Sequence, residues 1–481
     1  MSRNVTELYP NFSAEINVLR KDEPSIDLLY KIIQKHRYNS RYNKKLYDRY
    51  RTLENEVPIF KRGSRFDEDP INNKINNDFF SEIVDFKTGY FAGEPISYGY
   101  SKGSEAEEVT GGAIGVDRAT KAITDFVTRN NMYGVDMETT KFASIYGYAG
   151  RLFYIDLEGN VRVMPVHGFE TIILSDTDIS EPEYAVRYYE VWDINKVRSW
   201  VVEFYDNAYI YTYKGYLSNL KLIEKKKHGF DYCPLQGIAN NKELMGDAEK
   251  VLALIDDYDK VLSDNSNEVE SFVHAYMIFK NLSVDDNTIR EAQKNGAIKI
   301  MSTGTQDGEV SFLTKNINDS YTEHHLDRLQ DNIYRFSKTP NLNDESFGSA
   351  SGISLKFKLH GLETKCGMFE AKMMDAAQYM WKLLCSVWRK KNIEVDPLQI
   401  TMDFTRNFPL DTLTEAQTVQ ALIAAGLPKE VAYSQLSFVD DVDYVMEMIE
   451  QEMNGISPIE AEKQSNNDLE LENTEENQVT E

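Results

Sequence analysis

The sequence has few of the features that mark secreted, membrane-spanning or metal-binding proteins. It contains only 3 cysteines in 481 residues, and neither their odd number nor the spacing of Cys233, Cys366 and Cys385 suits a disulfide framework or a metal site. No apolar run approaches the ~20 residues needed to span a bilayer, and the first residues contain no apolar signal segment. We therefore expect a protein that is made and kept in a reducing cytosol, without a membrane span, a metal or a cofactor.

Signatures of catalysis are also missing. The sequence contains no G-x-x-x-x-G-K-[ST] phosphate loop and no G-x-S-x-G, H-E-x-x-H or C-x-x-C motif. The glycines of residues 111–115 follow Glu105, Glu107 and Glu108, which would repel a phosphate. We expect residues 101–117 to form an acidic, solvated loop, and we predict that the chain is not an enzyme.

Positive charge is scarce relative to negative charge. The chain has 53 Lys and Arg against 78 Asp and Glu, a net charge of -25. Such a chain repels phosphate, which argues against tight wrapping of nucleic acid. A passage through which DNA slides without sticking is compatible with the same charge. The acidic, Asn- and Gln-rich residues 455–481 are expected to be disordered.

The best-marked region of the sequence is β-rich. Between about residues 145 and 214, short segments rich in β-branched and aromatic residues alternate with turn residues such as Glu158-Gly159-Asn160. This pattern predicts antiparallel strands joined by hairpins. Helices are expected before it, over residues 26–55 and within residues 71–95.

Two long segments show helical periodicity. Residues 247–279 contain neither Pro nor Gly, and their apolar residues recur every three or four positions, which predicts a helix whose last residues fit a strand equally well. A second seam runs from Leu359 to Val387. Either seam could pack within the chain or against the same helix of a neighbouring subunit, and periodicity does not distinguish the two. The outer face of the first helix is acidic: Asp256, Asp257, Asp259, Asp264, Glu268 and Glu270.

The region between the two seams contains shorter elements. Residues 281–319 are expected to form a compact insert with a helix at 283–296 and strands at 297–301 and 309–314, and a helix is expected at 320–338. A polar loop follows at residues 341–351. Ile353, Leu355, Phe357 and Leu359 alternate like a strand, but we expect the long helix to begin here. Short helices are expected over residues 414–453.

The histidine pair and the acidic pairs are the remaining candidates for chemistry. His324 and His325 point about 100° apart on a helix and cannot share a metal ion without other ligands, so they are expected on a solvated face. Asp256 and Asp257 suggest a metal-dependent nuclease as one alternative. The two seams suggest another, a non-catalytic intracellular scaffold or adaptor that binds partner helices.

Three segments of the chain resemble the portal proteins of long-tailed bacteriophages of Gram-positive hosts. The segment NNKINNDFFSEIVDFKTGYFAGEPISY at 72–98 resembles the family's asparagine-rich start, helix and G-Y-(small)-x-G-x-P run. The segment HGFDYCPLQGIANNKELMGDAEKVLALIDDYDKVLSDNSNEVESF at 228–272 is similar to its N-N-x-E…D…L-I-D-x-Y run. FGSASGISLKFKL at 347–359 looks like the entry to its long helix. The segments occur in the family's order, over roughly residues 25–453.

The resemblance implies an α+β portal fold with a mixed wing domain, two long stem helices, a small α/β clip and a helical crown. By position it implies an N-terminal arm at 1–25, the wing at 26–247, stem helices at 248–274 and 318–338, the clip at 275–317, a tunnel loop at 339–353, a long wing helix and return at 354–404, the crown at 405–454 and the acidic tail at 455–481.

The resemblance also implies a function and partners. A late viral protein of this type forms a ring, usually a homododecamer, at one vertex of the virion capsid, and double-stranded DNA passes through it during packaging and ejection. The implied partners are the terminase, the scaffold and major capsid proteins and the head–tail connector proteins, with assembly in the host cytoplasm. The implied channel residues are Asn341, Asn343, Asp344, Glu345, Ser346, Phe347, Ser349, Lys356 and Lys358, together with a stem acidic face of Asp256, Asp257, Asp259, Asp264 and Glu268.

Overall fold

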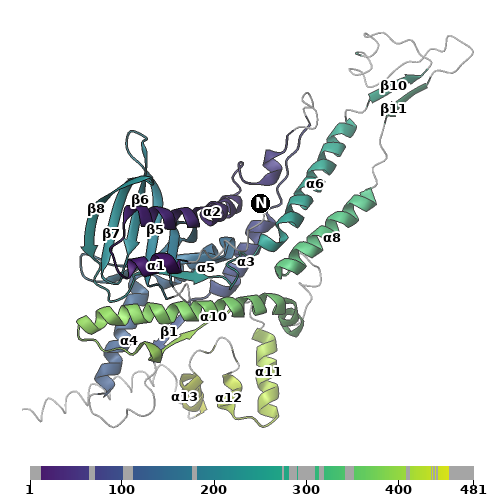
Figure 1. Cartoon of the computed structure of the whole chain (residues 1–481). Coiled ribbons are helices and arrows are strands. Elements are labelled where there is room, and N and C mark those ends of the chain that lie inside the picture. The colour runs from purple at the N-terminus through teal and green to yellow at the C-terminus, as the bar shows by residue number, and fades with distance from the viewer. Residues whose placement is uncertain are drawn as a thin grey trace, which may run out of the picture. The chain divides into compact units, whose positions relative to one another are not determined.

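The computed structural model combines helices and antiparallel sheets (Figure 1). It describes residues 12–63, 71–100, 112–175, 181–273, 276–280, 290, 309–313, 319–341, 352–407, 412–434, 436, 439 and 442–453. The chain divides into two compact units, Met1–Asp344 with Lys358–Asn407, and Glu345–Phe357 with Phe408–Glu481. The mixture of helix and sheet confirms the α+β class that the sequence predicts.

Five helices precede the β-rich region in the described residues, and a short 3-10 turn, η2 (Pro58–Lys61), interrupts them. The longest begins at Ile26 and is capped by the preceding Ser25, whose hydroxyl accepts a hydrogen bond from the main chain of Leu28 at 3.2 Å. Three boundaries differ from the predicted ones: the helix expected over residues 26–55 ends at Tyr50, residues 71–78 are not helical, and the expected loop at 101–117 is already helical from Gly112. The helices are α1 (Ser13–Leu19), α2 (Ile26–Tyr50), α3 (Phe79–Ala92), α4 (Gly112–Arg129) and α5 (Met132–Tyr146).

The β-rich region forms two antiparallel sheets, as the alternating pattern predicts. The first has the order β3-β2-β9 and the second the order β4-β5-β6-β7-β8. Helices α1 and α2 cover one face of the larger sheet, where Ile16, Leu29 and Ile33 pack against Val186 and Phe204. The strands are β2 (Tyr148–Ile155), β3 (Val161–His167), β4 (Thr171–Leu174), β5 (Tyr184–Trp192), β6 (Arg198–Tyr205), β7 (Tyr209–Tyr216), β8 (Asn219–Lys227) and β9 (Leu235–Ala239), with the 3-10 turn η3 (Gly168–Glu170) before β4.

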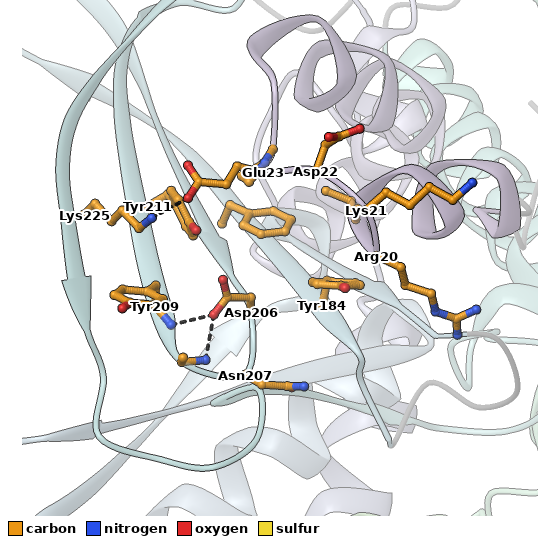
Figure 2. Close-up of a pocket in the computed structure, with 14 residues that line it drawn as sticks. Arg20, Lys21, Asp22, Glu23, Tyr184, Asp206, Asn207, Tyr209, Tyr211 and Lys225 are labelled. Carbon is orange, nitrogen blue, oxygen red and sulfur yellow. Dashed lines mark hydrogen bonds and ion pairs between the residues drawn. The ribbon is translucent and has the colours of Figure 1, made fainter.

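A pocket of about 420 Å³ opens beside the larger sheet (Figure 2). The segment between α1 and α2 forms one side, and the β6–β7 turn and β8 form the other. Lys225 donates a hydrogen bond to Glu23 at 2.6 Å and lies over the rings of Tyr209 and Tyr211. The predicted site residues do not line this pocket.

The long helix α10 (Gly352–Lys390) is the central packing element of the first unit. It has 39 residues and is therefore about 58 Å long at 1.5 Å per residue. Every residue of its predicted seam is at most 5% exposed, which shows that this seam packs within the chain. The adaptor hypothesis requires an exposed seam that can bind a partner helix, and this seam is not exposed. Its members are Leu359, Leu362, Cys366, Phe369, Met373, Ala376, Met380, Leu383 and Val387.

The beginning of α10 settles the ambiguity between strand and helix in favour of the helix. Alternate residues of a helix point about 200° apart and fall on opposite sides. Accordingly Phe357 is 78% exposed whereas Leu359 is buried. After α10, the 3-10 turn η5 (Pro397–Gln399) leads into β12 (Ile400–Asp403), which pairs antiparallel with β1 (Ser97–Tyr100).

The second unit contains the short helices predicted for residues 414–453. They are α11 (Thr412–Ala424), α12 (Lys429–Tyr433) and α13 (Val442–Met453). The predicted acidic tail at 455–481 lies outside the described residues. In the described residues, no helix is long and apolar enough to cross a membrane, and all three cysteines are free and buried.

Candidate functional site

A two-helix hairpin with a β-ribbon beyond its helices is the most distinctive feature of the first unit (Figure 1). Helix α6 (Leu252–Val273), preceded by the 3-10 turn η4 (Glu249–Val251), packs against α8 (Asp319–Ser337). Between them in sequence, β10 (Tyr276–Lys280) pairs antiparallel with β11 (Glu309–Leu313). The end of the predicted 247–279 helix is therefore a strand, the alternative that its sequence left open. The helix expected at 283–296 and the strand expected at 297–301 lie outside the described residues, apart from Arg290.

The apolar seam of α6 is buried only at the base of the hairpin. Val251 and Ile255 are almost completely buried, and Leu326, Leu329 and Ile333 of α8 are buried as well. Towards the ribbon the same seam opens, and Val269 is 59% exposed. Among the seam residues whose burial the structure describes, those at the base are therefore covered by contacts within the chain, whereas Val269 towards the ribbon is not.

An aromatic wedge fixes the base of the hairpin to α3. The ring of Phe79, the first residue of α3, lies 5.0 Å from Tyr258 of α6 and 5.7 Å from Tyr334 of α8, both edge to face. The hydroxyl of Tyr334 donates a hydrogen bond to Glu82 at 2.9 Å. Both hairpin helices are thus attached to the same turn of α3.

The asparagine-rich segment 71–78, named here the strap, lies along α6. The main chain of Asn73 donates to Asn267 at 2.6 Å, that of Ile75 to Ser263 at 2.9 Å and that of Asn77 to Asp259 at 3.0 Å. Every fourth residue of a helix advances by ~6.0 Å, and every second residue of an extended chain by ~6.6 Å. Because these two spacings nearly match, a row of side chains on one face of α6 can accept hydrogen bonds from the main-chain N–H groups of alternate strap residues.

One carboxylate of the predicted acidic face is buried against the strap. Asp259 is only 1% exposed, so its predicted place on an outer face is wrong. Burial raises the pKa of Asp259, and hydrogen bonds from the main chain and side chain of Asn77, the latter at 2.8 Å, oppose that shift. This carboxylate therefore holds the strap.

The other predicted acids lie on several sides of α6 and are not gathered into one cluster. Asp256 accepts a hydrogen bond from Arg49 of α2 at 2.5 Å, and Asp264 forms an ion pair with Arg62. Asp257 lies 3.6 Å from His325 of α8, and Glu268 is half-buried. Within the described residues, no group of three His, Cys, Asp or Glu side chains is placed to hold a metal ion.

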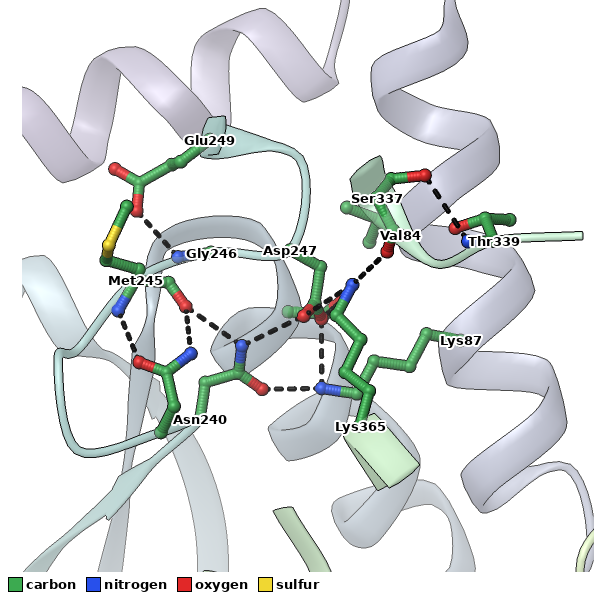
Figure 3. Close-up of polar contacts among 12 residues, drawn as sticks. Val84, Lys87, Asn240, Met245, Gly246, Asp247, Glu249, Ser337, Thr339 and Lys365 are labelled. Atoms are coloured by element: carbon green, nitrogen blue, oxygen red, sulfur yellow. Dashed lines mark hydrogen bonds and ion pairs between the residues drawn. The ribbon is translucent and has the colours of Figure 1, made fainter. Parts of the chain in front are cut away.

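A buried ionic cluster, named here the anchor, lies beneath the hairpin (Figure 3). Asp247, five residues before the start of α6, is 2.9 Å from the ammonium group of Lys87 on α3 and 3.0 Å from that of Lys365 on α10. Ser144 donates to the same carboxylate at 2.5 Å and Asn240 donates to it at 3.2 Å. The side chains of Lys87 and Asp247 are each 1% exposed.

The electrostatics of the anchor favour an ionised Asp247. Burial opposes the charged carboxylate, but the ammonium groups of Lys365 and Lys87 and the hydrogen bonds from Ser144 and Lys87 outweigh it and hold the pKa of Asp247 well below its usual range. Burial also lowers the pKa of Lys365, against the attraction of Asp247. Asp247 is therefore ionised at neutral pH, between the side chains of Lys87 and Lys365.

The anchor also ties together the two helices that flank the predicted tunnel loop. The ammonium group of Lys365 donates to the main-chain carbonyl of Ser337, the last residue of α8, at 2.9 Å. One side chain therefore joins α10 to the end of α8. The main chain next to Asp247 is tightly packed, because a Cβ on Gly246 would lie 2.2 Å from the carbonyl oxygen of Ile145.

Most of the predicted loop residues lie outside the described part of the chain. The structure describes Asn341, which is half-buried, and places Lys356 and Lys358 in α10, where Lys358 is half-buried. The others, which lie outside it, are Asn343, Asp344, Glu345, Ser346, Phe347 and Ser349.

Sequence reasoning missed the anchor, although one signal was present. Lys87 follows Ile83 and Val84 by four and three positions and so shares the apolar face of α3. A lysine on such a face needs a buried anion. Nothing in the sequence says that the anion is Asp247 or that Lys365 joins it.

Comparisons with known proteins identify the family of the chain. The family model described as "Phage portal protein, SPP1 Gp6-like" matches residues 29–458. The portal protein of Bacillus phage SPP1 is 24% identical over 459 residues, covering 90% of this chain and 87% of that protein. The portal protein of Clostridium phage phiCD119 is 24% identical over 421 residues, covering 81% of this chain and 88% of that protein. The chain therefore belongs to the SPP1 Gp6-like family of phage portal proteins.

Proposed function

We propose that the chain assembles into a ring of twelve subunits at one capsid vertex, through which double-stranded DNA is packaged and ejected. Family membership supports the portal function itself, since the family consists of structural, non-catalytic capsid components. The hydrolysis that drives packaging would then belong to a terminase that docks on the ring. Assembly in the host cytoplasm would precede incorporation into the virion.

The single observation that carries the ring is the half-covered seam of the hairpin. Val251 and Ile255 are buried within the chain, whereas Val269, further along the same seam, is 59% exposed. A single exposed aliphatic residue is normal on a protein surface, but Val269 continues a seam that is buried further down, and a continuous apolar stripe on a helix faces a packing partner. In a ring, the hairpin of the neighbouring subunit would cover them, so this part of the seam would pack between subunits.

Simple geometry is compatible with a DNA channel. Twelve helices spaced ~10 Å apart on a circle give a diameter of about 38 Å through their axes, and about 28 Å remains after one helix radius is removed on each side. A B-form duplex is about 20 Å wide and passes such an opening. The negative charge of the chain would keep the wall from binding phosphates tightly.

The proposed parts follow the order of the chain. Helices α6 and α8 would form the stem, β10 and β11 would belong to the clip that faces the terminase, and α11 to α13 would form the crown. Residues 339–353 would be the tunnel loop that faces the DNA, with both flanking helices held by the anchor. The remaining partners would be the scaffold and major capsid proteins and the head–tail connector proteins.

A deletion within the loop separates the channel role from a structural one. Removing residues 344–349 should leave the ring intact, because the anchor and the hairpin base lie outside this segment. It should block packaging, measured as nuclease-protected DNA in capsids of the phage that encodes the chain. The matched control removes residues 103–108, a stretch of equal length from the predicted acidic loop. Failure of the ring to form, or normal packaging by the deletion variant, would contradict the assigned role.

A further inference from the structure

Strand β8 forms one edge of the five-stranded sheet, and its outer side has no partner in the described part of the chain. It pairs antiparallel with β7 on one side, and it is the last strand of the order β4-β5-β6-β7-β8. Among the described residues, no other main-chain segment hydrogen-bonds to Asn219–Lys227. An edge of this kind presents main-chain N–H and C=O groups to an approaching chain.

Apart from Leu220, which is buried, the residues of β8 are exposed on both faces of the sheet. Residues 221–227 are all exposed, although successive side chains of a strand point to opposite faces. Leu222 is 50% exposed and Ile223 is 64% exposed. Ile223 has no partner in β7, because the register shifts between Thr212 and Tyr213. Both main chain and aliphatic side chains are thus available at this edge.

The edge is also basic, within a chain of net charge -25. Lys221 lies directly opposite Lys214 of β7, a like-charge pair on one face that is unfavourable without an anion between the two. Lys225 already donates a hydrogen bond to Glu23, and the ammonium group of Lys226 lies 3.7 Å from the carboxylate of Glu224. Across the residues that the structure describes, no acidic side chain forms an ion pair with Lys221.

We propose that β8 is a docking edge for an acidic segment of a partner protein, which adds to the sheet as a further antiparallel or parallel strand. The segment would alternate carboxylate and aliphatic side chains. Its main chain would pair with β8, and its carboxylates would lie near Lys214 and Lys221, which face each other on one side of the sheet. Its aliphatic groups would point to the other side and cover Leu222, which lies opposite Tyr213, and the adjacent Ile223. Strand addition of this kind takes its affinity from the main chain and its specificity from alternate side chains.

Two other occupants fit the edge less well. A second copy of β8 would place lysines against lysines. A DNA duplex would satisfy the lysines, but its phosphates only accept hydrogen bonds, so they would leave the strand carbonyls unpaired and the aliphatic residues uncovered. Lysines on edge strands also discourage pairing with neutral strands, which is consistent with selection for an acidic one.

The test uses the full chain and a fluorescein-labelled, end-capped peptide of alternating Glu and Leu, with 9 residues to match β8. Fluorescence anisotropy at physiological salt should show saturable binding. Reversing two charges in Lys214→Glu with Lys221→Glu, the facing pair, should weaken it by about tenfold or more. The matched control, Lys242→Glu with Lys429→Glu, reverses two exposed charges elsewhere and should change the affinity by less than about twofold. The same peptide N-methylated on successive residues should not bind, because neither of its edges can then donate hydrogen bonds.

Four results would overturn the proposal. Equal binding by the parent chain and the double variant would show that the lysines do not contribute to peptide binding. Unchanged binding of the N-methylated peptide would show a charge contact without strand addition. A duplex DNA that competes the peptide away and depends on the same lysines would assign the edge to nucleic acid. Absence of peptide binding at millimolar concentration would mean that the lysines only protect an unused edge.

Discussion

The anchor predicts a large and specific loss of stability when its only carboxylate is neutralised. The substitution Asp247→Asn keeps the size of the side chain but leaves the ammonium groups of Lys87 and Lys365 facing a neutral amide at a site that is 1% exposed. Breaking a buried ion pair on one side costs about 3–5 kcal/mol, mostly because the remaining charge stays buried without a partner. We expect the free energy of unfolding to fall by that amount.

Urea unfolding at pH 7 measures this loss, since the carboxylate is ionised there and the contribution of its low pKa is lost only as the pH falls below about 4. The control is Asp257→Asn, which removes a carboxylate that is 47% exposed and 3.6 Å from His325 and should cost less than about 0.5 kcal/mol. Adding Lys365→Met to Asp247→Asn should restore at least about 1 kcal/mol by removing one unpaired ammonium group. A loss below about 1 kcal/mol for Asp247→Asn, or no recovery in the double variant, would refute the reasoning.

Two further predictions concern His36 and the strap. The ring nitrogens of His36 lie 2.9 and 2.8 Å from the hydroxyls of Tyr188 and Tyr148, and burial lowers the pKa of His36 to about 4. The unfolded chain binds this proton more readily than the folded one. The contribution of His36 to the free energy of unfolding is therefore complete above pH 6.5 and falls by about 2 kcal/mol by pH 5. Urea unfolding at both pH values should show that His36→Gln removes this part of the pH dependence, whereas His324→Gln, at an exposed position, should not. Asn77→Ala should cost about 1–3 kcal/mol because Asp259 loses a side-chain donor at a buried site. Asn76→Ala, at the neighbouring position of the strap, should cost less than about 0.5 kcal/mol in the same assay. Equal losses for the two would argue against the role of Asp259 in holding the strap.

The sequence predicted best where one surface of an element is buried within the chain. The seam of α10 repeats every three or four residues from Leu359 to Val387, and all of these residues are buried. The strand-like alternation at its start covered only four residues, and it continued into the longer helical pattern. The hairpins of the β-rich region were predicted for the same reason, because their alternation reflects one covered face.

The sequence failed where no single face is buried or where the partners lie far apart in the chain. Strand β8 was not predicted because its exposed residues, KLIEKKK, have no alternation to detect. The strap was assigned to a helix because its donors are paired with side chains of α6 nearly two hundred positions later. The anchor joins Lys87, Asp247 and Lys365, and local patterns carry no information about such pairings. The predicted loop residues stay a prediction.

The mass of the purified assembly tests the central claim most directly. Each subunit has a mass of 55.4 kDa, so a ring of twelve has a mass of about 665 kDa. Mass photometry, with negative-stain images of the same sample, should show this species with an open centre. Substituting Val269→Asp at the uncovered part of the hairpin seam should shift the population towards single subunits. A chain that remains a monomer or dimer, at or below about 111 kDa under all assembly conditions, would contradict the account.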